Sequence, residues 1–339
     1  MTFPHRVRYL CATFLLFCTA LIAGVAARVH GQTNSAQAQQ RLVAITIDDL
    51  PGAIPGSDKG MGDLKEYQRI NRAIPAILAA HHVPAIGFVN ERKVQVAGER
   101  DARTALLQIW LDAGMTLGNH TYSHASFQTM PLAQFEDETI RGEVVTRALM
   151  TSAGKPLTYF RHPFLETGPT PEAKAAFETF LKERGYKVAP VTVDNSDWMF
   201  NDLFGRALEK KDKKLAAKTK AAYLEYEETI RAYFESVSRT LFGREIAEIY
   251  LLHDNAINVE CLDALLTHLE KLGYKFVSLD EALTDPAYAT PDQYIGAQGI
   301  SWLTRWKISF GQKADFEHDP DPPKWVLQMD EEIRKSRTH

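Results

Sequence analysis

Short apolar runs alternate with longer stretches in which apolar residues recur at helical spacing, from residue 41 to about residue 285. This alternation predicts a β/α rhythm in which each short run is a buried strand. Glycines stand where three of the intervening helices would end, as expected of left-handed C-cap residues: Gly114, Gly185 and Gly273. The seven predicted strands are 42–47, 85–89, 115–117, 157–160, 187–193, 249–252 and 276–279.

Strands that alternate with helices favour a parallel sheet with the helices outside it, either closed into a barrel or left open. Seven strands indicate an incomplete barrel, so we expect an α/β fold of the irregular (β/α)7 type. Pro190 cannot donate a ladder hydrogen bond, and the fifth strand is therefore expected to be an edge, bulged or shortened.

Two segments are longer than this rhythm requires. The first, 201–243, predicts a helical insertion between strands five and six, and the second, 286–339, is a C-terminal extension. Charged residues at 209–214 are interpreted as a solvated face. Trp302 and Trp306 share a helix face at i, i+4 spacing, and Trp325 lies further along the extension. We interpret the aromatic residues of both segments as packing rather than as sugar-binding platforms. Those of the insertion belong to a helically spaced stripe: Tyr223, Tyr226, Ile230, Phe234, Val237 and Leu241.

The N-terminus has the pattern of a targeting segment. Arg6 and Arg8 precede an apolar run that ends near residue 26. We expect residues 1–26 to be a signal peptide or an uncleaved membrane anchor, followed by a polar linker at 27–40. The rest of the chain would then be exported to the periplasm or the extracellular space, with the membrane contacted only through such an anchor.

Composition and charge narrow the classes of function. The 339 residues are 45% hydrophobic and carry a net charge of −4, as in a soluble globular protein without a basic surface for nucleic acid. Two of the three cysteines, Cys11 and Cys18, lie in the predicted leader. Cys261 would be left without an internal disulfide partner.

Two adjacent carboxylates, Asp48 and Asp49, directly follow the first predicted strand. Consecutive side chains of a strand point to opposite faces, but a turn at the end of the strand can bring both to one site. His120 and His124 follow the third strand, and four-residue spacing on a helical turn would place both imidazoles on one face. Two imidazoles and one carboxylate leave open positions on a metal ion for water and substrate.

Other reactive side chains also follow predicted strands. The stretches 161–164, 194–198 and 251–253 close strands four, five and six, so five of the seven strand ends carry polar candidates. The carboxyl ends of the strands of a parallel α/β barrel share one face, where active sites form. We therefore expect these groups to converge.

Together, these segments resemble the five motifs of the polysaccharide deacetylases, carbohydrate esterase family 4, also called the NodB homology domain. The motifs, in order, are Thr46-Ile47-Asp48-Asp49, His120-Thr121-Tyr122-Ser123-His124, Arg161-His162-Pro163-Phe164, Asp194-Asn195-Ser196-Asp197-Trp198 and Leu251-Leu252-His253. The resemblance implies a NodB-like domain over residues 41–285. Two positions depart from the family pattern: Ile47 stands where phenylalanine is usual, and Leu165 where a glycine is common.

The resemblance also implies a metal site. Asp49, His120 and His124 would hold one divalent ion, zinc in the first place, with cobalt or nickel as alternatives. Asp48 would be the general base, and Arg161 would pair with it and keep it ionised.

The remaining implied roles concern the substrate. The backbone amide of Phe164 would stabilise the oxyanion, and His253 would protonate the leaving group. Asp197, with Asp194 as second choice, would hold the ring of His253. Trp198 and Leu251 would wall a groove for the acetyl methyl group.

The function implied is that of a hydrolase of linear amide bonds, an N-deacetylase that releases acetate from N-acetylated amino sugars of a polysaccharide or oligosaccharide. Two alternatives stay open: an O-acetyl esterase acting on acetylated xylan or another decorated polysaccharide, and a non-catalytic glycan binder.

Overall fold

The computed structural model describes residues 40–53, 62–314 and 319–337. The predicted leader and most of the predicted linker, residues 1–39, lie outside the described residues. Among the helices that are described, none combines the length and the apolar character that crossing a membrane requires.

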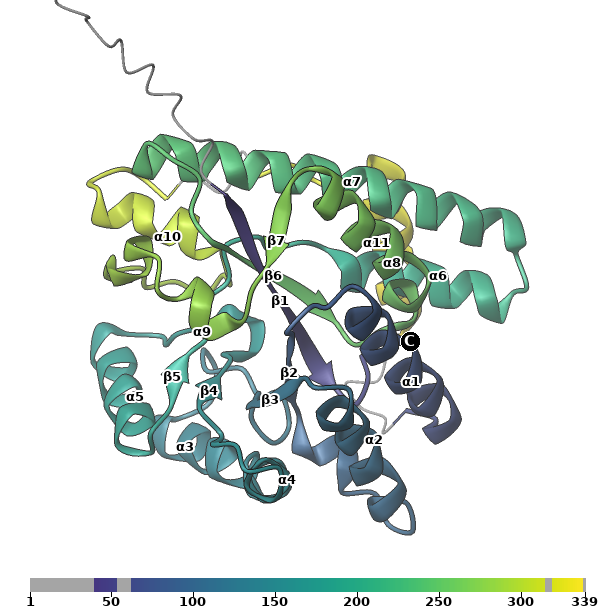
Figure 1. The fold of residues 1–339 in the computed structure, drawn as a ribbon, viewed down its shortest axis with the longest axis horizontal. Helices are drawn as coiled ribbons and strands as arrows, with labels where there is room; N and C mark the ends of the chain where they lie inside the picture. Colours follow the sequence, from purple (N-terminus) through teal and green to yellow (C-terminus); the bar gives the residue numbers. More distant parts are fainter. Residues whose placement is uncertain (1–39, 54–61, 315–318, 338–339) are drawn as a thin grey trace, which may run out of the picture. The chain divides into compact units, whose positions relative to one another are not determined.

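The strands form one parallel sheet, as predicted (Figure 1). β1 pairs with three strands, β2, β6 and β7. The order along the sheet is β5-β4-β3-β2-β1-β6. The strands are β1 (Arg41–Leu50), β2 (Ile86–Val89), β3 (Thr116–Asn119), β4 (Tyr159–Phe160), β5 (Lys187–Val188), β6 (Glu248–His253) and β7 (Tyr274–Phe276).

The fifth strand is shorter than predicted. β5 pairs with β4 through residues 187 and 188 only, and Pro190 then interrupts the strand. Val193 forms a parallel bridge with Tyr250 of β6, and its amide donates to the Ile249 carbonyl at 3.1 Å. One segment thus contacts β4 at its start and β6 at its end, and the sheet curls back on itself as in the predicted irregular barrel.

Helices follow the strands along the chain and cover the sheet. Gly114, Gly185 and Gly273 have φ of 88°, 79° and 82°, which confirms the three predicted left-handed positions. The prediction for the last strand was displaced, because Ser278 accepts a hydrogen bond from the Glu281 amide and begins a helix there. The helices flanking the sheet are α1 (Leu64–Ala80), α2 (Arg100–Asp112), α3 (Leu132–Arg141), α4 (Val144–Ser152), α5 (Pro171–Glu183), α8 (Ala256–Lys271) and α9 (Leu279–Ala282), with short 3₁₀ helices η1 (Glu91–Val94), η2 (Pro163–Leu165) and η3 (Pro286–Ala289).

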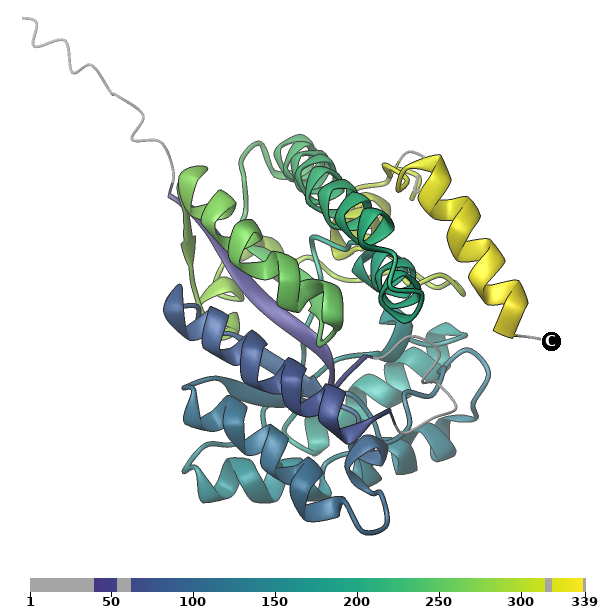
Figure 2. The ribbon, with the colours of Figure 1, turned by 90° about the vertical axis from the view of Figure 1, so that its right-hand side faces the viewer.

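The stretch between β5 and β6 forms two helices, α6 (Asp197–Glu209) and α7 (Lys213–Phe242), and the first begins earlier than the predicted insertion. α7 runs beside α8 and α10 (Trp302–Ser309) (Figures 1 and 2). Residues 209–214 are exposed, as expected. The apolar stripe is core, which confirms the packing interpretation: Tyr223, Tyr226, Ile230, Phe234 and Val237 are buried and Leu241 is half-buried.

The C-terminal extension packs onto both helices of this stretch. α10 contacts α7, and the last helix, α11 (Lys324–Arg337), contacts α6. Trp302 and Trp306 are both buried, as the packing interpretation requires. The Trp306 ring meets Phe242 of α7 edge to face, with centroids 5.6 Å apart. The Trp302 amide donates to the Val191 carbonyl at 2.7 Å and so ties α10 to the fifth-strand segment.

We expect Trp306→Ala to lower the free energy of unfolding by about 3–5 kcal/mol, because it leaves a cavity between α10 and α7. Chemical denaturation followed by circular dichroism measures this. Phe310 is the matched control, since its ring also meets Phe242, at 5.6 Å, but is 47% exposed. Phe310→Ala should cost about 1 kcal/mol or less. Equal losses of unfolding free energy for the two variants would contradict the packing of Trp306 in the core.

Candidate active site

A break in the regularity of β1 turns its two terminal carboxylates toward one place. The pairing of β1 with β2 shifts register between Ile47 and Leu50, and Asp49 has a left-handed backbone with φ of 74°. Asp48 stays in the parallel register with β6, opposite His253. Adjacent carboxylates that a regular strand would point apart therefore both reach the end of the sheet.

His120 and His124 lie on an irregular loop after β3. The predicted helical turn is wrong, because Thr121 and His124 have φ of 65° and 59° and no helix is assigned over these residues. The Asn119 side chain accepts from the Thr121 amide at 2.8 Å, and Thr121 Oγ1 accepts from the His124 amide at 3.1 Å. These bonds shape the loop, and the two imidazoles lie 4.9 Å apart, centroid to centroid.

One carboxylate and two imidazoles form a cluster with the spacing of a metal site. Asp49 Oδ1 lies 3.9 Å from His120 Nε2 and 3.7 Å from His124 Nε2, and the ligand atoms of all three residues are within 4.8 Å of one another. Ligand atoms around a tetrahedral zinc ion are about 3.4 Å apart, so a small inward movement would close this set on an ion.

The hydrogen bonds of His120 and Asp49 leave one ligand atom of each residue available. His120 Nδ1 lies 2.8 Å from the Arg161 carbonyl, which fixes the proton on Nδ1 and leaves the Nε2 lone pair facing Asp49. Asp49 Oδ1 is buried without a hydrogen-bond partner. Burial holds the pKa of His120 well below its usual value, so the ring is neutral, as a ligand must be. The residues fit a divalent ion.

Asp48 lies against this cluster but has different neighbours. Its Oδ2 is 3.7 Å from His120 Nε2, and its Oδ1 is 4.0 Å from Arg161 Nε. Arg161 is fully buried and donates to Thr46 Oγ1 at 2.8 Å. Burial raises the pKa of Asp48 to about 6, against the opposing charges of Arg161 and His253. A carboxylate in this state can accept a proton near neutral pH.

Lys93 of η1 is a site residue that the sequence analysis missed. Its amine donates to the Asp49 carbonyl at 3.0 Å and lies 3.5 Å from Asp49 Oδ1. Burial would raise the pKa of Asp49, but Lys93, followed by His124 and His253, holds it well below its usual value. Asp49 therefore stays ionised.

His253 and Asp197 form a tightly bonded pair at the start of α6. Asp197 Oδ1 lies 2.6 Å from His253 Nδ1, and Asp197 Oδ2 accepts from the His253 amide at 2.8 Å and from Asn258 Nδ2 at 2.6 Å. Burial lowers the pKa of His253, but the Asp197 carboxylate outweighs burial and raises it to about 10. Of the two carboxylates considered for this ring, the structure therefore pairs Asp197 with it, and not Asp194.

The predicted substrate-facing residues are placed less uniformly. Phe164 is 51% exposed, and its ring meets His124 edge to face at 4.3 Å. Trp198 is 38% exposed, with the guanidinium of Arg334 4.6 Å from its ring, whereas Leu251 is buried in the core. The groove predicted from Trp198 and Leu251 stays a prediction.

Asn90 and Lys93, which the sequence analysis missed, also lie directly after the end of a strand. Residues 90–93 come directly after β2, and Asn90 Nδ2 donates to the His120 carbonyl at 2.6 Å. Looking for polar residues at the end of the second strand would have identified Asn90 and Lys93. Asn258, inside α8, carries no comparable signal in the sequence.

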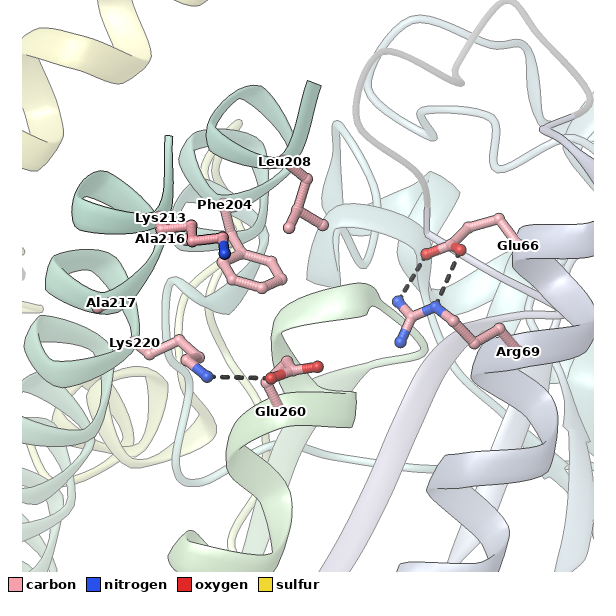
Figure 3. A pocket seen from close by; sticks show the side chains of 9 residues that line it. All are labelled: Glu66, Arg69, Phe204, Leu208, Lys213, Ala216, Ala217, Lys220 and Glu260. Atoms are coloured by element: carbon pink, nitrogen blue, oxygen red, sulfur yellow. Dashed lines mark hydrogen bonds and ion pairs between the residues drawn. The ribbon is translucent and has the colours of Figure 1, made fainter. Parts of the chain in front are cut away.

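A surface cavity of about 390 Å³ lies between α1, α6, α7 and α8 (Figure 3). Two ion pairs, Glu66 with Arg69 and Lys220 with Glu260, lie on its walls. None of the candidate catalytic or metal-binding side chains lines it. This cavity is separate from the site at the end of the sheet.

Residues 35–188 match the sequence model of the polysaccharide deacetylase family. The chain carries a polysaccharide deacetylase domain. The family predicted from the five motifs is thereby confirmed. The matched region includes Asp48, Asp49, His120, His124 and Arg161 and ends before β6.

The deacetylase domain also resembles individual proteins. The chain is 24% identical over 220 residues to the peptidoglycan-N-acetylmuramic acid deacetylase PdaA of Bacillus subtilis, covering 63% of this chain and 66% of that protein, slightly under two thirds of its length. A family 4 acetyl xylan esterase from Clostridium thermocellum, solved with a cobalt ion, is 21% identical, with coverages of 72% and 91% and a TM-score of 0.47. A family 4 pseudoenzyme from Bacillus anthracis is 19% identical, with coverages of 72% and 66% and a TM-score of 0.45.

We expect the metal-stripped protein to bind one equivalent of Zn²⁺ or Co²⁺ in isothermal titration calorimetry. Asp49→Ala and His120→Ala should each weaken binding by roughly a hundredfold or more, because each removes a ligand. His268→Ala is the control, since His268 is exposed and pairs with Glu228 of α7. Unchanged affinity in His120→Ala would contradict the assignment of these ligands.

Proposed function

We propose that this protein is a metal-dependent N-deacetylase that hydrolyses the acetamide group of N-acetylated amino sugars in a polysaccharide and releases acetate. One observation carries the proposal: a buried carboxylate, a three-residue ligand set and a carboxylate-held imidazole meet at the ends of β1, β3 and β6. Amide hydrolysis needs one group that accepts a proton and another that donates one, and the site holds both.

In this proposal Asp49, His120 and His124 hold a divalent ion, zinc in the first place because imidazole and carboxylate ligands suit it, with cobalt or nickel as alternatives. Such an ion acts as a Lewis acid toward the acetyl carbonyl and toward water. Asp49 contributes a fixed negative charge, and the fixed tautomer of His120 presents a lone pair.

Asp48 is proposed as the general base. It lies 3.7 Å from a ligand imidazole, close enough to reach a water molecule at the same place. Arg161, 4.0 Å away, orients the carboxylate without a short hydrogen bond that would compete for the proton. Asp48 accepts the proton of the attacking water as the water oxygen bonds to the acetyl carbon.

Two further groups are proposed to act on the oxyanion and on the leaving group. The Phe164 amide is proposed to donate to the oxyanion, and His253, protonated through its pairing with Asp197, gives its proton to the sugar nitrogen. The carbon–nitrogen bond then breaks, so that the products are acetate and a free amine. Positioned donors of this kind are typically worth a few kcal/mol each in the transition state.

The choice of an N-acetylated polymer is supported by the family match and by the similarity to the Bacillus subtilis relative, a peptidoglycan-N-acetylmuramic acid deacetylase. We propose further that the protein works outside the cytoplasm, on the strength of the basic and apolar pattern of residues 1–26. A polymer of the cell wall or matrix would be met there.

We expect Asp48→Asn to lower kcat by roughly a hundredfold or more while one equivalent of metal still binds, because the amide cannot accept a proton. Acetate release from an N-acetylated glycan oligomer, with metal content determined on the same preparation, measures both effects. A normal kcat in a metal-loaded Asp48→Asn protein would exclude Asp48 as the base.

Asp197→Asn should reduce kcat by roughly a hundredfold, because the neutral amide no longer stabilises a protonated His253. Asp194→Asn is the matched control: it is the same substitution three residues earlier, at a carboxylate that is not the hydrogen-bond partner of the His253 ring. Its kcat should stay within about tenfold of the wild type. Losses of similar size in both variants would mean that Asp197 has no particular role in holding the imidazole.

An acetate-release screen of the metal-loaded protein tests the activity as a whole. The substrates are peptidoglycan fragments, chitin oligomers and acetylated xylan. Release from an N-acetylated glycan is the expected result. Release only from O-acetylated glycans would replace the proposal by an esterase, and glycan binding without release from any substrate would replace it by a binder.

A further inference from the structure

The loop that carries Phe164 has an unusual backbone. Phe164 and Leu165 are consecutive non-glycine residues with φ of 54° and 56°. Side chains with a Cβ rarely adopt this left-handed conformation, and bulky ones least of all. Leu165 stands at the position where the resembled family commonly has a glycine. A glycine would adopt this conformation without strain, so contacts with the rest of the protein must hold Leu165 in it.

Arg305 of α10 contacts this loop from the C-terminal extension. Its side chain is fully buried, and one of its nitrogens donates to the Leu165 carbonyl. A second nitrogen donates to Thr167 Oγ1 at 3.2 Å and to Asp292 Oδ2 at 3.0 Å. The guanidinium thus contacts the loop at the last left-handed residue and two residues beyond it, and Asp292 supplies its counter-charge.

Arg305 is itself held rigidly. Its Nε donates to the Ile300 carbonyl at 2.9 Å, and its guanidinium lies 4.1 Å from the Trp302 ring centroid. Ser301 Oγ donates to the Thr192 carbonyl at 2.7 Å, which anchors the start of α10 beside the fifth-strand segment. The position of the guanidinium is therefore fixed relative to the sheet.

The extension also approaches the loop through a glycine. A Cβ at Gly299 would lie 1.6 Å from the Phe164 carbonyl oxygen, so no other residue fits there without moving the Phe164 peptide. The Phe164 ring lies against His124, one of the candidate ligands. The extension therefore approaches Phe164 at its carbonyl, and the candidate ligand His124 contacts its ring.

We propose that Arg305 is a positioning residue for the reaction: it clamps the Leu165 carbonyl and holds the Phe164 amide toward the site, in place of the conformational freedom of a glycine. The inference rests on the proposed function, in which that amide stabilises the oxyanion. It makes the extension, outside the residues that match the family, part of the active site.

The test is a double-mutant cycle of Arg305→Met and Leu165→Gly. Arg305→Met should lower kcat roughly a hundredfold, as expected of a displaced catalytic group, with little change in KM or metal affinity. Adding Leu165→Gly should restore kcat to within about tenfold of the wild type, because glycine adopts the left-handed conformation without strain and has less need of the clamp. Additive losses, or a loss of metal binding equal to the loss of kcat, would overturn the proposal.

Hydrogen exchange provides a readout independent of activity. The amides of Leu165 and Glu166 donate to His162 and Pro163 carbonyls at 3.0 and 3.1 Å, and Arg305→Met should accelerate their exchange at least tenfold. Leu165→Gly should reverse this. If the wild type releases acetate from no glycan while the exchange behaves as expected, the proposed function fails and the clamp stands. Unchanged exchange refutes the clamp itself.

A variant that leaves Arg305 in place tests the proposal if Arg305→Met does not fold. Gly299→Ala keeps Arg305 but pushes on the Phe164 carbonyl, and should lower kcat with metal content unchanged. Gly296→Ala is the neighbouring control, since the three atoms nearest to a Cβ there belong to the Tyr294 side chain and none to Phe164. Equal activity of both alanine variants and the wild type would overturn the coupling between the extension and Phe164.

Discussion

A single backbone change at the end of β1 determines whether this site exists. In a regular strand, neighbouring side chains point to opposite faces, and only one of two adjacent carboxylates could reach the edge of the sheet. The left-handed conformation of Asp49 frees that residue from the strand while Asp48 remains paired opposite His253. Aspartate tolerates this conformation better than most residues. One dipeptide can therefore supply both a ligand and a separate carboxylate.

Because Asp48 and Asp49 have different neighbours, their pKa values differ. Asp49 is surrounded by Lys93 and the imidazoles and stays ionised, whereas Asp48 is buried deeply enough that its pKa is raised to about 6. The pKa of His253 is also raised, to about 10, because the Asp197 carboxylate outweighs burial. The pKa values of the two neighbouring carboxylates thus move in opposite directions because their surroundings differ.

The sequence was sufficient for a parallel sheet flanked by helices and for the convergence of Asp48, Asp49, His120 and His253, because parallel strands end at one edge. It was insufficient where the backbone conformation depends on distant contacts. The helical spacing of the two histidines was misleading, since side-chain acceptors of the loop bend it at positive φ. The fifth strand divides because its halves pair with different neighbours. Arg305 had no motif at all, since its importance arises from a carbonyl 140 residues away along the chain.

Lys93 gives the metal cluster a property that its three candidate ligands alone would not have. The amine lies 3.5 Å from Asp49 Oδ1 and offers that carboxylate a counter-charge before any cation arrives. Structural zinc modules unfold when stripped, because metal binding supplies much of their folding free energy. Here the Lys93 ammonium lies beside Asp49 without any cation, so the fold does not need a bound ion to neutralise this carboxylate.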